Sequence, residues 1–150
     1  MKEAVNLAKE NLKLKNGGPF GAIVVRDGKI IGRGVNTVTT QNDPTAHAEI
    51  NAIRDACHFL GHFQLEDCDI YSSCEPCPMC LSAIYWADIR MLYYANGRSD
   101  AERMGFMDKH LYHELSLAED VRKLQTTRIA VPEMAELMKE WKGLEGKMLY

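Results

Sequence analysis

The sequence contains no long hydrophobic run, and this absence limits where the protein is expected to act. No stretch approaches the roughly 18 consecutive apolar residues that a membrane-spanning helix requires. The first residues interleave polar with apolar side chains and lack the apolar core of a secretory signal peptide. We therefore expect a cytoplasmic protein with no membrane partner.

The sequence also lacks an excess of basic residues. Its 18 Lys and Arg residues are outnumbered by 21 Asp and Glu residues, and the net charge is −3 at pH 7. Proteins that bind a nucleic-acid backbone usually carry clustered Lys and Arg, and no basic cluster stands out here. A local basic patch is compatible with this composition, but a large polynucleotide is a disfavoured substrate.

A disulfide framework is a third feature that the sequence does not suggest. The chain has five cysteines, an odd number, and no export signal. Under these conditions metal binding or catalysis is a more typical use of cysteine than disulfide formation. We interpret Cys57 and Cys68 as small buried apolar residues.

Hydrophobic periodicity and turn residues predict one α/β domain of 150 residues. Helices are expected over 1–15, 43–60, 77–87, 108–115 and 132–141. Strands are expected over 20–25, 30–35, 69–73, 91–95 and 124–131, the first two joined by an Asp-Gly turn. This order is typical of a layered α/β domain with one mixed sheet.

Two short motifs indicate a metal site: His47-Ala48-Glu49 and Pro76-Cys77-Pro78-Met79-Cys80. One imidazole and two thiolates form a ligand set that suits Zn²⁺. Three protein ligands leave a fourth tetrahedral position for water, as in catalytic zinc sites. The predicted elements place each motif in the first turn of a helix, where the partial positive charge favours thiolates.

Glu49 lies two residues after the expected ligand His47. A carboxylate beside the metal, but not bound to it, is suited to general acid–base catalysis. Other interpretations of the motifs are a redox pair, a closed structural zinc site with Cys74 as a fourth ligand, and an iron–sulfur site. A zinc-stabilised binding module without turnover is also conceivable, but these alternatives give no purpose to Glu49.

The chain resembles the cytidine deaminase-like superfamily, and in particular the bacterial guanine deaminases. The motifs that carry this resemblance are Gly17–Ala22, Asn36, Asn42–Glu49, Cys74–Cys80, Ala83–Ala87, Gly105-Phe106 with Asp108, and Tyr150. His-x-Glu with Pro-Cys-x-x-Cys is the signature of zinc nucleobase deaminases. The resemblance implies a three-layer α-β-α fold with a central mixed five-stranded sheet, one Zn²⁺ per subunit, and deamination of guanine to xanthine and ammonia.

The same resemblance implies roles for residues around the expected metal. Asn36 would hydrogen-bond the purine, Phe20 and Trp86 would form pocket walls, and the Ala48 N–H would help to hold the ring. Asp108 would contact the base and assist proton transfer. Each has a structural alternative: core packing for Phe20 and Trp86, a turn for Asn36, and a helix cap for Asp108.

The resemblance further implies a homodimer in which the C-terminal segment, about 132–150, is exchanged between subunits. Tyr150 would close the pocket from this segment. Its structural alternative is a frayed terminus, because chain ends are often disordered unless they are tied down.

Two other substrates stay open at this stage. Bacterial tRNA adenosine deaminases share much of Asp43–Glu49 and the Pro-Cys-x-x-Cys motif, although Gly105–Asp108 and the tail Gly146–Tyr150 are similar to guanine deaminases. Another amino-heterocycle, such as cytosine, a pterin or a triazine, differs from guanine by only a few pocket contacts.

Overall fold

The computed structural model describes residues 1–149, so Tyr150 and its expected role lie outside the described residues. The chain divides into two compact units, Met1–His113 and Glu114–Tyr150. Within residues 1–149, no helix combines the length and apolar character needed to cross a membrane.

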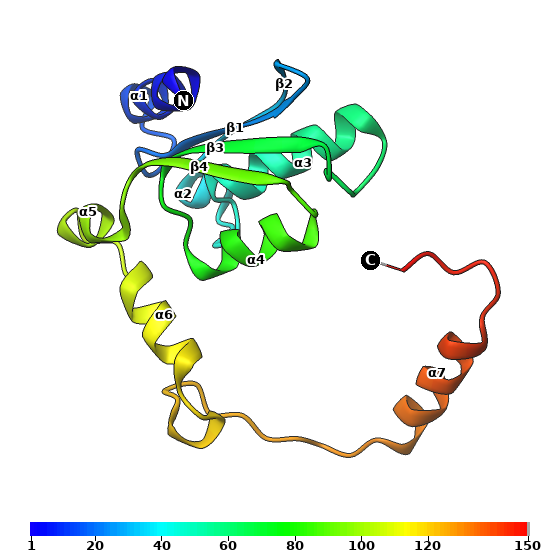
Figure 1. Ribbon diagram of the computed structural model, residues 1–150. Helices are drawn as coiled ribbons and strands as arrows, with labels where there is room; N and C mark the ends of the chain where they lie inside the picture. The colour runs from blue at the N-terminus through cyan, green and yellow to red at the C-terminus, as the bar shows by residue number, and fades with distance from the viewer. Residues whose placement is uncertain (150) are drawn as a thin grey trace. The chain divides into compact units, whose positions relative to one another are not determined.

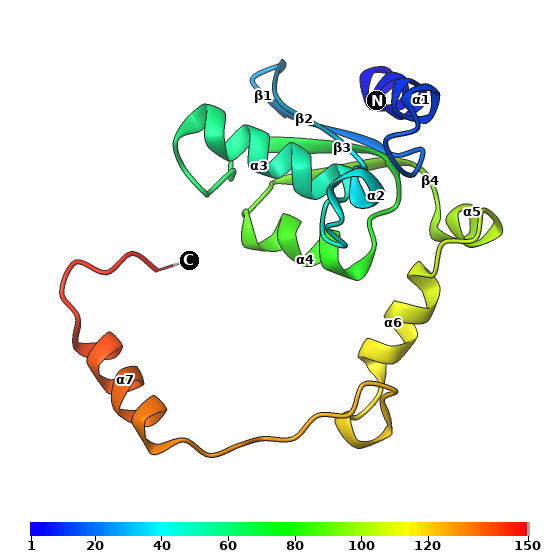
Figure 2. The ribbon, with the colours of Figure 1, turned by 180° about the vertical axis from the view of Figure 1, so that it is seen from behind.

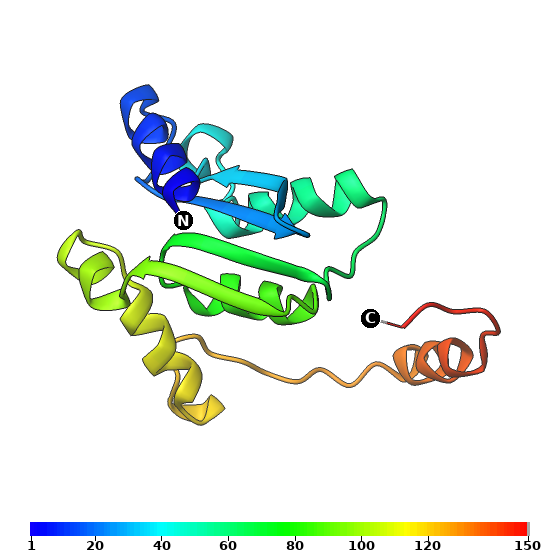
Figure 3. The ribbon, with the colours of Figure 1, turned by 45° about the horizontal axis from the view of Figure 1, so that its top comes forward.

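The first unit is built on a mixed sheet of four strands in the order β2-β1-β3-β4. The strands are β1 (Gly21–Arg26), β2 (Lys29–Val35), β3 (Cys68–Cys74) and β4 (Met91–Asn96). β1 runs antiparallel to both of its neighbours, whereas β3 and β4 are parallel and lie side by side in Figure 3. The mixed sheet is as expected, but its strand number is not.

The prediction of a fifth strand over 124–131 was wrong. This stretch is irregular and pairs with no strand among the described residues. Leu124 and Ile129 are 74% and 79% exposed. An apolar, β-branched run forms a strand only where a partner strand and a packed face exist, and the sheet ends at β4 without one.

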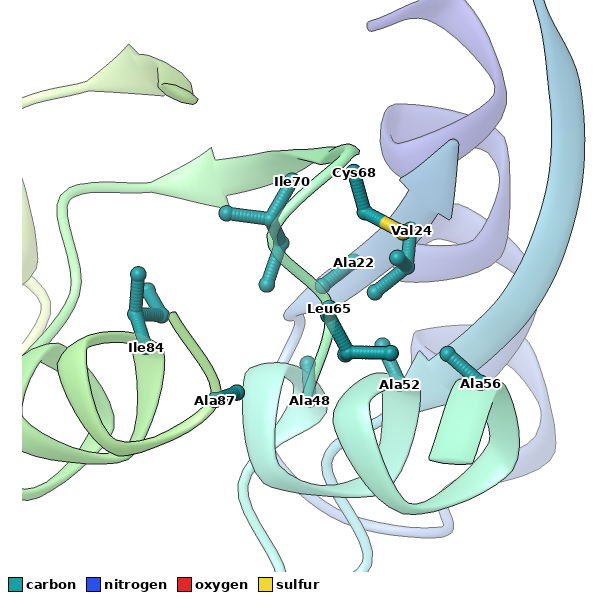
Figure 4. Packing of buried hydrophobic residues seen from close by; sticks show 10 residues of the cluster. All are labelled: Ala22, Val24, Ala48, Ala52, Ala56, Leu65, Cys68, Ile70, Ile84 and Ala87. Carbon is teal, nitrogen blue, oxygen red and sulfur yellow. The ribbon is translucent and has the colours of Figure 1, made fainter. Parts of the chain in front are cut away.

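Helices cover both faces of the sheet. α1 (Lys2–Leu14) lies on one face, and α3 (Ala48–Leu60) and α4 (Pro78–Trp86) lie on the other, as Figure 1 and the reverse view in Figure 2 show. Figure 4 shows the core between the sheet and these two helices. Its buried members are Ala22, Val24, Ala48, Ala52, Ala56, Leu65, Cys68, Ile70, Ile84 and Ala87. The α/β fold with three layers is therefore present.

Helix α3 approaches β2 unusually closely because small residues face each other there. A Cβ atom added to Gly34 would lie 2.0 Å from the carbonyl oxygen of Ala48. A Cβ added to Gly32 would lie 2.4 Å from that of Ala52. Glycine on the strand thus fixes the distance between the sheet and the start of α3.

The two helices that follow the motifs begin later than expected. α3 begins at Ala48 with His47 as its N-cap, rather than at the Asp43-Pro44 pair. Asp43 instead accepts hydrogen bonds from the Thr45 N–H (2.8 Å) and hydroxyl (2.7 Å) in a local turn. α4 begins at Pro78 with Cys77 as its N-cap. His47 and Cys77 are therefore cap residues, not first-turn residues.

Three further helices complete the first unit. α2 (Val38–Gln41) and α5 (Arg98–Arg103) are short and were not expected from the sequence. α6 (Asp108–Ser116) begins at the predicted residue and continues into the second unit.

The second unit contains a short 3-10 helix, η1 (Glu119–Val121), and α7 (Pro132–Gly143). Apolar side chains on α7 are between 45% and 56% exposed in the single chain: Met134, Leu137, Met138 and Trp141. This amphipathic helix therefore does not bury its apolar residues within the single chain.

Candidate active site

The two N-caps bring the three predicted metal ligands together. His47 Nδ1 lies 3.6 Å from Cys77 Sγ and 3.5 Å from Cys80 Sγ. The ligand atoms of the three residues all lie within 4.8 Å of one another. Because α3 and α4 start side by side, residues that are 30 and 33 positions apart in the sequence form one cluster.

These distances fit a zinc ion. Zn–S bonds of about 2.3 Å and Zn–N bonds of about 2.0–2.1 Å at a tetrahedral angle place sulfur and nitrogen about 3.5–3.6 Å apart. Both sulfur–nitrogen distances in the cluster have this value. The donor set of one imidazole and two thiols is also the one that Zn²⁺ prefers.

Hydrogen bonds among the three predicted ligands favour the thiolate form of one of the two cysteines. The hydrogen bond with Cys77 raises the pKa of His47. Hydrogen bonds from Cys80 and His47 lower the pKa of Cys77, against the effect of its burial. The bond to Cys77 raises the pKa of Cys80, so its proton must leave when a metal binds.

Cys74 does not belong to this ligand set. Its Sγ contacts the Gly97 carbonyl oxygen at 3.8 Å, and the metal-ligating group found among residues 1–149 does not include it. Burial raises the pKa of the Cys74 thiol to about 11, so it stays protonated at neutral pH. The arrangement disfavours a four-ligand structural zinc site and a three-cysteine iron–sulfur site.

Glu49 lies in the first turn of α3, where its side chain hydrogen-bonds the predicted ligand Cys80. The residue is only 5% exposed, and its Oε1 accepts a hydrogen bond of 2.5 Å from the hydroxyl of Ser72. Burial raises the pKa of Glu49, and the Ser72 hydrogen bond opposes this shift. A carboxyl in this environment holds a proton more readily than one in water, which suits it to accept a proton and return it.

A cavity of about 220 Å³ opens over the cluster and Glu49. Its lining residues are Gly18, Phe20, Asn36, Val38, Thr39, His47, Ala48, Glu49, Cys74, Glu75, Cys77, Phe106 and Asp108. Cavities for drug-sized ligands are about 300–1,000 Å³, so this one suits a small heteroaromatic base.

Asn36 is held in this cavity with a defined orientation. It is buried at the end of β2, and its Oδ1 accepts hydrogen bonds from the Gly18 N–H (3.2 Å) and the Val38 N–H (3.3 Å). The buried amide of Asn11 donates to the Asn36 carbonyl oxygen at 2.8 Å. Since its side-chain oxygen is engaged by the backbone, Asn36 is set to present its amide nitrogen to a ligand.

Two aromatic rings form one wall, and only one of them was predicted. Phe20 packs edge to face against Phe106 with ring centroids 4.7 Å apart. Phe106 was noted in the family motif but given no role. Trp86, the other predicted wall, is 64% exposed in the single chain and is not among the lining residues of this cavity.

Asp108 enters the cavity at the first residue of α6, where burial raises its pKa. Later in the same helix, the Tyr112 hydroxyl donates to the Pro76 carbonyl oxygen at 3.0 Å. The Arg98 guanidinium lies 4.0 Å from the centre of the Tyr112 ring and donates to the Glu75 carboxylate. These contacts, which the sequence did not reveal, attach α6 to the loop that carries Cys77.

Comparison with known proteins agrees with this geometry. The family described as "Cytidine and deoxycytidylate deaminase zinc-binding region" matches residues 1–96. The chain is 47% identical to guanine deaminase of Bacillus subtilis over 150 residues, which cover all of this chain and 96% of that protein.

A solved structure and a second group of relatives extend the comparison. The X-ray structure of guanine deaminase from Bacillus subtilis superposes with a TM-score of 0.95 over 99% of this chain and 95% of that chain. A tRNA-specific adenosine deaminase of Agrobacterium fabrum is 51% identical, but only over 76 residues, which cover 51% of this chain and 50% of that protein.

Proposed function

We propose that this chain, which belongs to the zinc-binding cytidine and deoxycytidylate deaminase family, catalyses the hydrolytic deamination of guanine to xanthine and ammonia. The observation that carries the proposal is the cluster of His47, Cys77 and Cys80 at tetrahedral zinc distances, with buried Glu49 hydrogen-bonded to Cys80. The likeness to a guanine deaminase along the whole chain supports guanine as the substrate.

His47, Cys77 and Cys80 would hold the Zn²⁺ ion. When bound there, zinc acts as a Lewis acid that lowers the pKa of water toward 7 and so makes it a nucleophile at neutral pH. Glu49 accepts a proton from the attacking water and passes it to a ring nitrogen of guanine. It then delivers a proton to the departing amino group, so that guanine and water become xanthine and ammonia.

The cavity residues would bind and orient the base. Phe20 would cover one side of the ring together with Phe106, and the amide nitrogen of Asn36 would donate to a purine acceptor. The Ala48 N–H, at the first position of α3, has no acceptor within its own helix and would donate to the ring edge. Asp108 would accept a hydrogen bond from the base and assist proton transfer.

We also propose that the protein is a homodimer in which the segment of about 132–150 is exchanged. The exposed apolar residues of α7 and the exposed surface of Trp86 support this proposal, because a second copy would cover this apolar area. Trp86 would then become a pocket wall, and Tyr150 would close the cavity of the other subunit.

Mixing two inactive variants tests this exchange. Glu49→Gln lacks the proton carrier, and a chain without Tyr150 lacks the lid residue. After both are unfolded and refolded together, exchanged dimers contain one complete site and regain up to about a quarter of the parent activity on statistical grounds. The exchange would be contradicted if the two variants, refolded separately and then combined, regained as much activity as the co-refolded mixture. A monomeric mass by light scattering would also contradict it.

Ammonia release by the zinc-loaded protein tests the proposed function. The panel contains guanine, adenine, cytosine, a pterin, a triazine, nucleosides and a tRNA anticodon stem-loop. Turnover of guanine with slow turnover of the others is the expected result, and Glu49→Gln is expected to abolish it while one zinc stays bound. Turnover of only another ring would discard guanine, and salt-sensitive deamination of the stem-loop would favour a tRNA adenosine deaminase.

A further inference from the structure

A serine stands at a position of the sheet where an apolar residue is expected. The inward side chains of β3 are Cys68, Ile70, Ser72 and Cys74. Three of them are apolar or nearly so, whereas Ser72 has a hydroxyl and is fully buried. A buried hydroxyl without a partner destabilises a protein. The Ser72 hydroxyl is tolerated because it forms hydrogen bonds.

Both hydrogen-bonding functions of this hydroxyl have a partner. The Ser72 oxygen accepts from the Cys74 N–H at 3.4 Å and donates to Glu49 Oε1 at 2.5 Å. Ser72 lies on β3, which has a neighbouring strand on each side, and Glu49 lies on α3, whose approach to the sheet is fixed by the strand glycines. The contact is therefore made between two rigid elements.

The contact makes the two oxygens of Glu49 unequal. Oε1 is occupied by the Ser72 hydroxyl, so a proton taken up by the carboxylate is directed to Oε2. Without this bond, the carboxylate would keep only its hydrogen bonds with its own backbone N–H and with the Cys80 thiol. Its last torsion, which has a broad energy profile, would then be less restricted. Proton transfer to two successive acceptors requires one defined donor atom at hydrogen-bond distance.

We propose that Ser72 is a positioning residue for the deamination reaction, because its hydroxyl holds Oε1 of Glu49 so that Oε2 carries the proton between water and substrate. This inference rests on the proposed hydrolytic deaminase function, but not on the identity of the ring. It predicts that loss of the hydroxyl lowers kcat and leaves KM and the zinc content unchanged, since Ser72 contacts neither the cavity nor the metal ligands.

Three substitutions test this role. Ser72→Ala removes only the hydroxyl. Ser72→Thr and Ser72→Val both add a branch at Cβ and have similar shapes, but threonine keeps the hydroxyl where valine has a methyl group. A hydrogen bond to a charged group contributes about tenfold to a hundredfold in rate or equilibrium terms. We expect kcat to fall by about this factor in Ser72→Ala and Ser72→Val, and Ser72→Thr to recover most of the loss.

The measurements are kcat and KM for the best substrate of the parent protein, zinc per chain, and thermal unfolding. Equal kcat for the threonine and valine variants, a parent-like kcat for Ser72→Ala, or a loss that follows zinc release would overturn the proposal. If the larger side chains of threonine and valine prevent folding, the kcat of Ser72→Ala decides whether Ser72 positions Glu49. Failure of the parent protein to deaminate guanine, with activity on another ring, would refute only the substrate assignment.

Discussion

Gly34 provides a direct test of how the sheet positions the metal site. In Gly34→Ala, the new Cβ would start 2.0 Å from the Ala48 carbonyl oxygen, whereas ordinary contacts begin at 3.4 Å. The start of α3 must therefore move away from the sheet by about 1.4 Å, since the opposing atom belongs to the backbone. His47 and Glu49 move with it, because they lie at the N-cap and in the first turn of this helix.

The size of this movement predicts the size of the effect. Functional metal sites tolerate about ±0.2 Å in ligand distances, and a misplacement of about 1 Å in a catalytic site costs about a hundredfold in rate. We expect Gly34→Ala to lower kcat by at least that factor and to weaken zinc binding. Overpacking should also lower the free energy of unfolding by about 1–3 kcal/mol.

The assay combines a zinc-affinity titration against a competing chelator, kcat, and urea unfolding. Gly32→Ala is the matched control, because it places a Cβ 2.4 Å from the Ala52 carbonyl oxygen, one helical turn farther from the ligands. It should destabilise the fold similarly but weaken zinc binding less. Parent-like zinc affinity and kcat in Gly34→Ala would refute the reasoning.

Three further predictions concern individual side chains. Asn36→Asp should raise KM for the base by about tenfold or more, because the carboxylate keeps the two backbone hydrogen bonds but loses the amide donors. Steady-state kinetics checks this prediction, and an unchanged KM would show that Asn36 does not bind the base. Cys74→Ser should retain one zinc per chain by atomic absorption, and loss of the metal would restore the four-ligand interpretation. The Arg98 hydrogen bond lowers the pKa of Glu75 below its ordinary value of 4.5, so the stabilising contribution of this pair is complete above that pH and is lost as the pH falls through the lowered value. Urea unfolding should therefore show Glu75→Gln to be less stable than the parent at pH 7, with a difference that shrinks as the pH falls below 4.5. A difference that does not depend on pH would contradict this linkage.

Local patterns in the sequence were sufficient to predict much of the fold. The Asp-Gly turn between β1 and β2 formed, with Asp27 and Gly28 at φ values of 50° and 74°, because few residue pairs tolerate two positive φ angles. The helix starts were placed less well, since Asp43 was equally suited to a cap and to the local turn that it forms with Thr45. The irregular 124–131 segment shows the limit of strand propensity. Its residues favour a strand, but the local sequence does not tell whether a neighbouring strand is available to pair with it.

The metal ligands were predictable because their chemistry is encoded in residue type and short spacing. The residues that support them were not, because each depends on a contact between distant segments. Ser72 meets Glu49 across 23 positions, and Tyr112 meets Pro76 across 36. The one signal available for Ser72 was a polar residue in the inward register of a buried strand. Trp86 and Tyr150 stay predictions that concern the proposed dimer.

The origin of the zinc ligands in two separate parts of the chain has a consequence for how active protein is made. His47 precedes the helix that packs on the β1–β2 hairpin, whereas Cys77 and Cys80 belong to the β3–α4–β4 unit. Metal capture therefore has to wait until these two pieces have docked, so the ion arrives last in assembly. The rate of cobalt uptake, measured by the thiolate–cobalt absorption band, would then report the rate at which the two pieces dock. Under metal scarcity, the docked chain would wait with its ligand cluster complete but without the ion, and metal supply rather than folding would set the yield of active protein.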